Sequence, residues 1–349
     1  MRHGTAIIAA AVLAAGIGRA AVEACTTFCV RTGNQVLFGR NYDFEFGRGL
    51  VVMNPARLEK TGFEPGGPAW VARHASLTFN QFGRDFPMGG MNDAGLVVEL
   101  MWHERAEYPS ADARKPLGVL QWIQYQLDTA ASVDDVLRSD RSVRVQGSVP
   151  LHYLVADASG RVATIEFISG VLRAETGAGL PVSVLANDTY ADDVAFWQNQ
   201  KGRRASGSGS PARFARAADA VRAFETAAGP DPVSRAFAIL DDVAQRNTRW
   251  SIVYDQVNRV VRFRTDTNRQ VRRIALESGG QDCARGAEVL DANAQWQGDV
   301  RARFEAYTEA RNRALVEASY REFSATRQSP REEIERVIAY PSTARCQGS

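Results

Sequence analysis

The residue whose position most constrains the chemistry is Cys25, because it directly follows a stretch typical of a cleavable leader. Residues 5–18 (TAIIAAAVLAAGIG) form an apolar run behind a weakly basic start, and small residues lead up to Ala24. The run is too short to span a bilayer comfortably, but a basic start, a short apolar segment and a small-residue site describe a secretory signal peptide. We therefore predict that residues 1–24 are removed on export, that the protein is periplasmic or secreted, and that Cys25 becomes the first residue.

A cysteine in first position can act as a nucleophile that carries its own base. The free α-amino group, whose pKa lies near 8, can take the thiol proton. The same position also fits a lipid anchor, in which case the chain is a non-catalytic lipoprotein or binding module. Glu23 is bulky and charged where lipoproteins carry a small residue, and no polar tether follows Cys25. We therefore expect no stable membrane anchor and keep the lipoprotein as the alternative.

The charge and the cysteines of the chain bear on which partners, metals and cofactors we expect. The formal net charge of +2 implies no nucleic-acid partner. Cys25 and Cys29 lack a matching Cys or His pair, so we expect no metal site and no cofactor. The other two cysteines, Cys283 and Cys346, flank a C-terminal stretch, and export allows a bridge between them that the sequence alone leaves open.

The elements that must position Cys25 are groups of antiparallel strands with helices between them. Alternating or apolar runs separated by turn residues predict strands, and apolar residues at helical spacing predict helices. We expect strands over 26–31, 35–42, 96–102, 151–157, 161–168, 171–175, 182–186, 250–255, 259–265 and 270–276, and helices over 117–127, 133–137, 232–244 and from Ser210 onward. Ser210 and Pro211 fit a helix start, and 287–338 reads as helical and charged. Strand groups and helices in this order predict an α+β fold.

Several short motifs follow Cys25 in a fixed order. They are CTTF at 25–28, LFGRNYD at 37–43, MNDAGL at 91–96, VLAND at 184–188 and SPARF at 210–214. Each motif alone is weak, but the ordered set behind a cleavable cysteine resembles the choloylglycine hydrolase and penicillin V acylase family of N-terminal nucleophile hydrolases. The resemblance covers about 25–276. It implies a four-layer αββα sandwich of two stacked antiparallel sheets. The segment 277–349 has no counterpart in that resemblance, and its pattern predicts a helical C-terminal extension.

The resemblance also implies roles for particular residues. Cys25 Sγ attacks an amide carbonyl to form a thioester, Arg40 steadies the thiolate and Asp43 holds the α-amine. Asn187 and the backbone amide of Trp102 donate to the oxyanion, and Arg213 stiffens the charges around the cysteine. No histidine is required, so His74, His103 and His152 are expected to be structural or surface residues, although His103 can touch the pocket.

The expected substrate is a small linear N-acyl amide of the bile-salt, penicillin V or N-acyl homoserine lactone type. Aromatic and apolar side chains are candidates for its acyl pocket, and for most of them an ordinary core role is equally compatible with the sequence. The candidates are Phe28, Phe44, Phe82, Met91 and Trp102. A homo-oligomer is compatible with the sequence.

Overall fold

The computed structural model describes residues 25–226, 231–277 and 283–347. The predicted signal peptide, 1–24, lies outside the described residues. None of the described helices is both long and apolar enough to cross a membrane.

The chain opens with the hairpin that carries the candidate nucleophile. Strand β1 (Thr26–Thr32) and strand β2 (Gln35–Asp43) pair antiparallel, with Thr27 opposite Arg40. Gly33 in the turn has a φ of +53°, a conformation that glycine adopts without steric cost. The two strands agree with those expected over 26–31 and 35–42, and the turn joins them into a hairpin.

The hairpin belongs to a sheet of seven strands. Its order is β14-β1-β2-β15-β16-β17-β19, antiparallel apart from the short parallel pair β17 and β19. The further members are β14 (Val184–Leu185), β15 (Thr248–Asp255), β16 (Val260–Thr265), β17 (Arg272–Ala275) and β19 (Gly298–Asp299). Strand β14 is shorter than the expected strand over 182–186 and ends two residues before Asn187.

A second sheet of nine strands contains the central motifs and the meander. Its order is β13-β12-β11-β8-β7-β6-β3-β18-β20, with antiparallel pairing between neighbours. The members are β3 (Leu50–Asn54), β6 (Ser76–Asn80), β7 (Pro87–Asn92), β8 (Val97–Trp102), β11 (Leu151–Ala156), β12 (Val162–Ile168), β13 (Val171–Thr176), β18 (Glu288–Asp291) and β20 (Glu305–Ala306).

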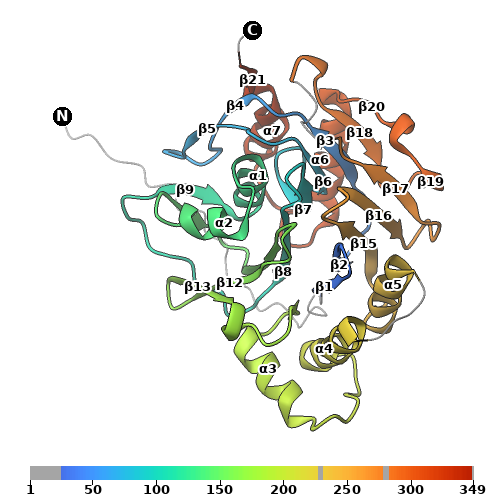
Figure 1. Cartoon of the computed structure of the whole chain (residues 1–349). Helices are drawn as coiled ribbons and strands as arrows, with labels where there is room; N and C mark the ends of the chain where they lie inside the picture. The colour runs from blue at the N-terminus through green and yellow to red at the C-terminus, as the bar shows by residue number, and fades with distance from the viewer. Residues whose placement is uncertain (1–24, 227–230, 278–282, 348–349) are drawn as a thin grey trace.

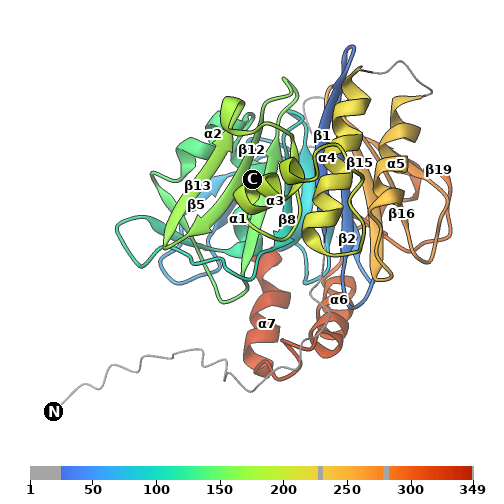
Figure 2. The same ribbon diagram turned by 90° about the horizontal axis from the view of Figure 1, so that it is seen from below.

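Helices cover the outer faces of the two stacked sheets (Figures 1 and 2). Helices α1 (Val119–Thr129) and α2 (Val133–Ser139) lie on the side of the nine-stranded sheet, and Ser132 caps α2 through a capping box. Helices α4 (Ser210–Thr226) and α5 (Pro232–Asp242) cover the seven-stranded sheet, and α3 (Tyr190–Asn199) packs on α4. The predicted α+β class and αββα layering are therefore confirmed.

The C-terminal segment differs from the expected helical extension. Its first half adds strands to both sheets, because Val289 and Leu290 of β18 are buried beside β3 and β19 pairs with β17. These strands are two to four residues long, too short for a period-2 pattern to appear. Only the second half is helical, with α6 (Glu309–Glu322) and α7 (Arg331–Ala339) beside one edge of the sandwich (Figure 2).

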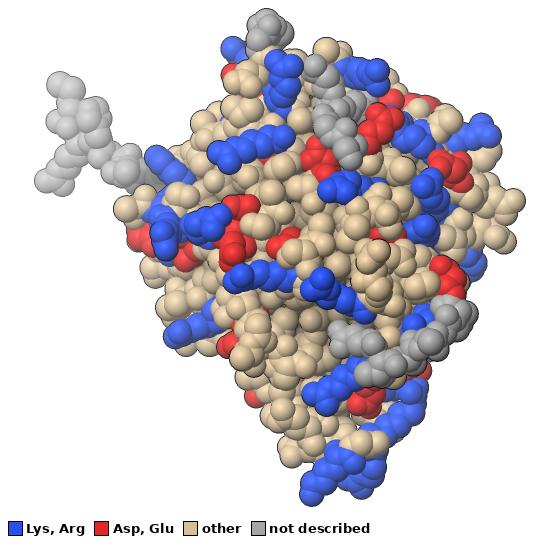
Figure 3. All heavy atoms as spheres, viewed as in Figure 1, with Lys and Arg blue, Asp and Glu red and all other residues tan. Residues whose placement is uncertain are grey.

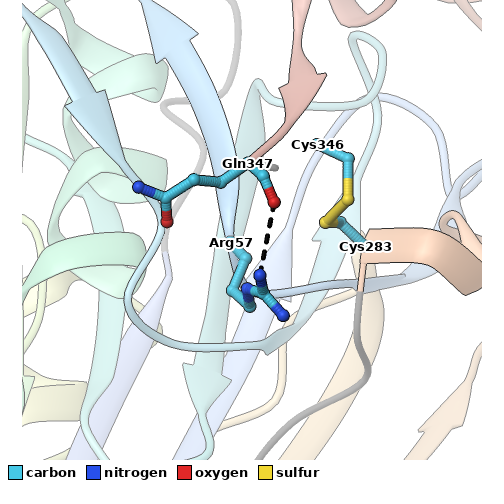
Figure 4. The surroundings of a disulfide bond; sticks show 4 residues. All are labelled: Arg57, Cys283, Cys346 and Gln347. Carbon is cyan, nitrogen blue, oxygen red and sulfur yellow. Dashed lines mark hydrogen bonds between the residues drawn. A yellow bond between two sulfur atoms is a disulfide. The ribbon is translucent and has the colours of Figure 1, made fainter. Parts of the chain in front are cut away.

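A disulfide fastens the chain end to the body. Cys283 and Cys346 are bonded, and Arg57 Nη2 donates to Gln347 O at 3.3 Å beside them (Figure 4). Strand β21 (Arg345–Cys346) pairs with β4 (Leu58–Thr61), which pairs with β5 (Ala69–Val71). The bridge that the sequence left open is thus present.

A further small sheet joins β9 (Lys115–Gly118) and β10 (Val143–Gln146).

Charges of both signs are interspersed over the face of the molecule seen in Figure 3. The loop after α3 carries the exposed basic residues Lys201, Arg203 and Arg204, the last of which pairs with Asp242.

Candidate active site

The hairpin places Cys25 at the end of β1, buried beside the end of β2. Its Sγ lies 3.9 Å from the carbonyl oxygen of Asp43. Thr27, two residues on, contacts the Met101 sulfur of the opposite sheet through its hydroxyl at 3.4 Å. Because side chains alternate along a strand, Cys25 and Thr27 share the face that looks toward the nine-stranded sheet. The candidate nucleophile therefore lies between the two sheets.

Arg213 connects Cys25 to Asn187. Its Nη1 donates to the carbonyl oxygen of Cys25 at 2.8 Å and to the hydroxyl of Thr26, and its Nη2 donates to Asn187 Oδ1 at 2.8 Å. The side chain is fully buried, and burial lowers the pKa of Arg213 although Asp43 and Cys25 act in the opposite direction. One guanidinium thus holds the nucleophile's backbone and the candidate oxyanion donor in a fixed relation.

The contacts of Asn187 fix the orientation of its amide. Arg213 can only donate, so the oxygen of Asn187 must face it, and Nδ2 then points to Trp102 O at 2.8 Å. The backbone N–H of Asn187 donates to Ser210 Oγ at 2.8 Å. The helix that starts near Tyr190 is capped by Thr189 and not by Asn187. The Ser210 hydroxyl, expected as a helix cap, accepts from Asn187 and Asp188 instead.

Arg40 extends from β2 across to the opposite sheet. It forms an ion pair with Glu99 of β8, and Nη1 and Nη2 donate to Met88 O at 2.7 Å and Leu100 O at 3.1 Å. Burial alone would lower the pKa of Arg40, but the negative charge of Glu99 and then that of Cys25 raise it above its usual value. The charge expected beside the thiol is present and is shared with a buried carboxyl group.

Glu99 is a site residue that sequence reasoning missed. Burial raises its pKa to about 7 against the lowering effect of Arg40, and Tyr254 donates to its second oxygen. In the sequence Glu99 only interrupts an apolar strand. A charged residue at an inward-facing position of a buried strand is the signal that could have identified it, since such charges need a partner.

Asp43 has a buried carboxyl group in which one of the two oxygens accepts a hydrogen bond from a described residue. Thr248 donates to Oδ1, and Oδ2 has no hydrogen-bond partner among the described residues. Burial raises the pKa of Asp43 to about 6, against the lowering effects of the Thr248 hydroxyl and of Arg213 and Arg40. These two arginines are the ones whose charges also act on Cys25.

Trp102 lies at the end of β8 and is partly exposed. Its carbonyl oxygen accepts from Asn187, and its indole N–H donates to Glu104 at 3.0 Å. The structure therefore brings Trp102 and Asn187 together through the carbonyl group of Trp102. The donation by its backbone amide stays a prediction.

Two of the candidate acyl-pocket residues lie close to Asp43. Phe44 stacks on Tyr42, and Phe82 is 6.1 Å from Phe44 between ring centroids. Phe323, which follows α6, packs on both, with centroids 5.0 Å and 5.6 Å away. The C-terminal segment thus contributes a wall to this aromatic cluster, which no sequence pattern had indicated.

Phe28 and Met91 lie away from this aromatic cluster, and their part in the acyl pocket stays a prediction. Phe28 is next to Thr27 on β1 and so points to the opposite face of the sheet, where it packs over Gly39. Met91 is fully buried and pairs with Val97. Val97 and Trp102 lie on opposite sides of Glu99 along β8, so Met91 is at the end of the strand pair that is remote from Trp102. Both are core residues because strand alternation and register, rather than apolar character, decide which side chains face the site.

One group of potential metal ligands also lies behind Trp102. Among the described residues, His103, His152 and Glu166 bring their ligand atoms within 4.8 Å of one another. No sequence motif indicates this group, because its members come from three separate segments. All three are buried, so His103 and His152 are not surface residues.

Comparisons with known proteins agree with this geometry. Residues 25–230 match the family described as linear amide C–N hydrolases, choloylglycine hydrolase family. Penicillin V acylase from Pectobacterium atrosepticum is 32% identical over 118 residues, which amount to 29% of this chain and 31% of that protein. The match to this curated relative thus spans about a third of its length.

Solved structures show the same fold. Penicillin V acylase from Agrobacterium tumefaciens superposes with a TM-score of 0.70 at 24% identity, covering 81% of this chain and 98% of that one. A mutant conjugated bile acid hydrolase from Clostridium perfringens gives a TM-score of 0.65 at 17% identity, covering 78% and 98%. Since the family match covers more than half of the sequence and begins at Cys25, the chain belongs to the choloylglycine hydrolase family of linear amide C–N hydrolases.

Proposed function

We propose that the protein is an exported amidohydrolase that cleaves small N-acyl amides through a thioester on Cys25. The observation that carries the proposal is the buried Oδ2 of Asp43, which lacks a partner among the described residues beside Cys25. A buried carboxylate oxygen without a partner is costly. Cleavage after Ala24 would supply one, because the new α-amino group of Cys25 can donate to it.

The reaction follows from the groups at the site. The α-amine takes the Cys25 thiol proton, and Sγ attacks the amide carbonyl carbon. The oxyanion accepts from the side-chain amide of Asn187 and the backbone amide of Trp102. Collapse breaks the C–N bond, and the α-ammonium group returns its proton to the leaving amine. Water then attacks the thioester with the α-amine as base, which releases the acid and the thiol.

Acyl specificity is proposed to come from the apolar side of the site. Phe44 and Phe82 form an aromatic cluster next to Asp43, and Trp102 stands on the other side near Asn187. Apolar walls with a few convergent polar groups suit an acyl group with an aromatic or lipid-like body. Phenoxyacetyl penicillins, conjugated bile salts and N-acyl homoserine lactones share this chemistry and form the test panel.

The decisive experiment compares the protein with and without residues 1–24. Mature protein beginning at Cys25 should hydrolyse a member of the panel, whereas protein that keeps 1–24, verified by intact mass, should be inactive because its α-amine is an amide. Mature Cys25→Ala serves as the control without a nucleophile. Full activity of the uncleaved protein, or a diacylglyceryl adduct on Cys25 together with an inactive panel, overturns the proposal, the latter in favour of a lipoprotein.

A further inference from the structure

Two stacked imidazoles lie directly behind the oxyanion residues. His152 of β11 is opposite Met101 of β8, and His103 directly follows Trp102. The two rings are nearly parallel, with centroids 4.7 Å apart and an interplanar angle of 12°. His152 Nδ1 is 3.5 Å from Glu166 Oε1. All three side chains are buried, so the group belongs to the interior behind the site.

The geometry does not favour a metal ion at this group. Imidazole lone pairs lie in the ring plane, so two stacked parallel rings cannot both direct a nitrogen at one ion. Two of the ligand atoms also have backbone partners already. His152 Nε2 contacts Ala186 O at 2.8 Å, and Glu166 Oε1 accepts from the backbone N–H of Tyr190 at 3.0 Å. Nε2 of His152 and Oε1 of Glu166 are therefore bonded to the backbone and support it.

This support acts on the peptide that carries Asn187. The carbonyl of Ala186 and the N–H of Asn187 belong to one planar peptide group. His152 contacts its oxygen at 2.8 Å, and Ser210 Oγ accepts from its nitrogen at 2.8 Å. Because Ala186 O only accepts, His152 must carry a hydrogen on Nε2. The peptide is therefore held at both ends, and its plane sets the direction of the Asn187 side chain.

We propose that His152 is a positioning residue that fixes Asn187 for oxyanion stabilisation. The proposal rests on the function proposed above for Asn187. Glu166 Oε1 accepts from the first N–H of α3, the helix that follows Asn187, and lies 3.5 Å from His152 Nδ1. A rotation of the 186–187 peptide would move the amide donor, and misplacement by about 1 Å can cost 100-fold in rate.

The test uses two amide variants that differ in reach. His152→Gln can place a donor where Nε2 stands, whereas the shorter His152→Asn reaches only the Nδ1 position. We expect His152→Asn to lower kcat about 10- to 100-fold with little change in KM, and His152→Gln to restore most of the loss. Alkylation of Cys25 should be unchanged in both, because neither variant touches the nucleophile.

Several results would overturn the inference. They are a normal kcat in His152→Asn, equal losses in the two variants, a parallel loss of Cys25 alkylation, and chelator inhibition that Zn²⁺ reverses. If His152→Asn does not fold, Ser210→Ala releases the other end of the same peptide and should show the same split between kcat and KM. Wild-type protein is assayed first on penicillin V and the rest of the panel. An inactive wild type refutes the proposed function, whereas an active wild type with indifferent variants refutes only the positioning role.

Discussion

Truncation of Asn187 should distinguish a loss of turnover from a loss of stability more clearly than any other single substitution at the site. Asn187→Ala removes the side-chain amide whose oxygen accepts from Arg213 and whose nitrogen donates to Trp102 O, both at 2.8 Å. The backbone of residue 187 and its bond to Ser210 remain. The nucleophile, its carbonyl contact with Arg213 and the neighbouring hairpin are also left in place.

The expected magnitudes follow from those two bonds. Losing one oxyanion donor costs about 100- to 1000-fold in kcat, roughly 3–4 kcal/mol. Losing the acceptor of a buried charged group costs about 1.5–3 kcal/mol of stability, and the bond to Trp102 O about 1 kcal/mol more. The variant should therefore fold, melt several degrees lower and lose turnover far beyond the fraction that is unfolded.

Thr189→Ala is the matched control. Thr189 caps α3 two residues away, and removing a cap costs about 1 kcal/mol of stability without touching a proposed catalytic group. The assay measures kcat and KM on the best substrate of the panel, the alkylation rate of Cys25 and the melting temperature of each variant. Turnover of Asn187→Ala within tenfold of wild type refutes the oxyanion role. An equal loss in Thr189→Ala shows that the segment, not the amide, is responsible.

Further variants test the charges around Cys25 and the disulfide between Cys283 and Cys346. The Glu99 carboxyl, whose pKa is about 7, gains a negative charge as the pH rises through that value and then opposes the effect of Arg40 on Cys25. Glu99→Gln should therefore lower the midpoint pH of Cys25 alkylation by about 1 unit, and Arg40→Lys should raise it. Unchanged midpoints in both variants would disprove that these two charges act on Cys25. Replacing Cys283 and Cys346 by Ser should lower stability by up to about 4 kcal/mol, since the bridge spans 63 residues, while turnover at 25 °C persists; an unaltered melting temperature would contradict this.

The local elements near the nucleophile could be predicted because each has its own signal. A turn around Gly33 between two β-prone runs defines the hairpin, and the hairpin alone brings Asp43 back beside Cys25. Ser132 caps α2, the helix expected over 133–137. These features depend on neighbours within a few residues, so alternation and capping rules suffice.

Features that depend on contacts between sheets could not be predicted in this way. Glu99 reaches Arg40 only because β8 and β2 face each other across the interior, and no local pattern reports that distance. The face of the sheet that Phe28 occupies could not be predicted from its residue type. Phe323 packs on Phe44 from far along the chain, and its position depends on how the C-terminal segment returns to the body.

The pairing of Cys25 with Asn187 shows why an arginine stands at position 213. The proposed oxyanion donor is useful only if it keeps a fixed distance from the proposed attacking sulfur, yet Cys25 directly precedes β1 and Asn187 follows β14, two segments far apart in the sequence. A planar guanidinium with donors at set angles can hold both, whereas a lysine could bond either partner but not fix their separation. Since the guanidinium offers only donors, it also forces the nitrogen of Asn187 away from itself and toward Trp102. Distance and amide orientation are thus set by one side chain, and His152 and Ser210 keep the peptide that carries the donor from turning.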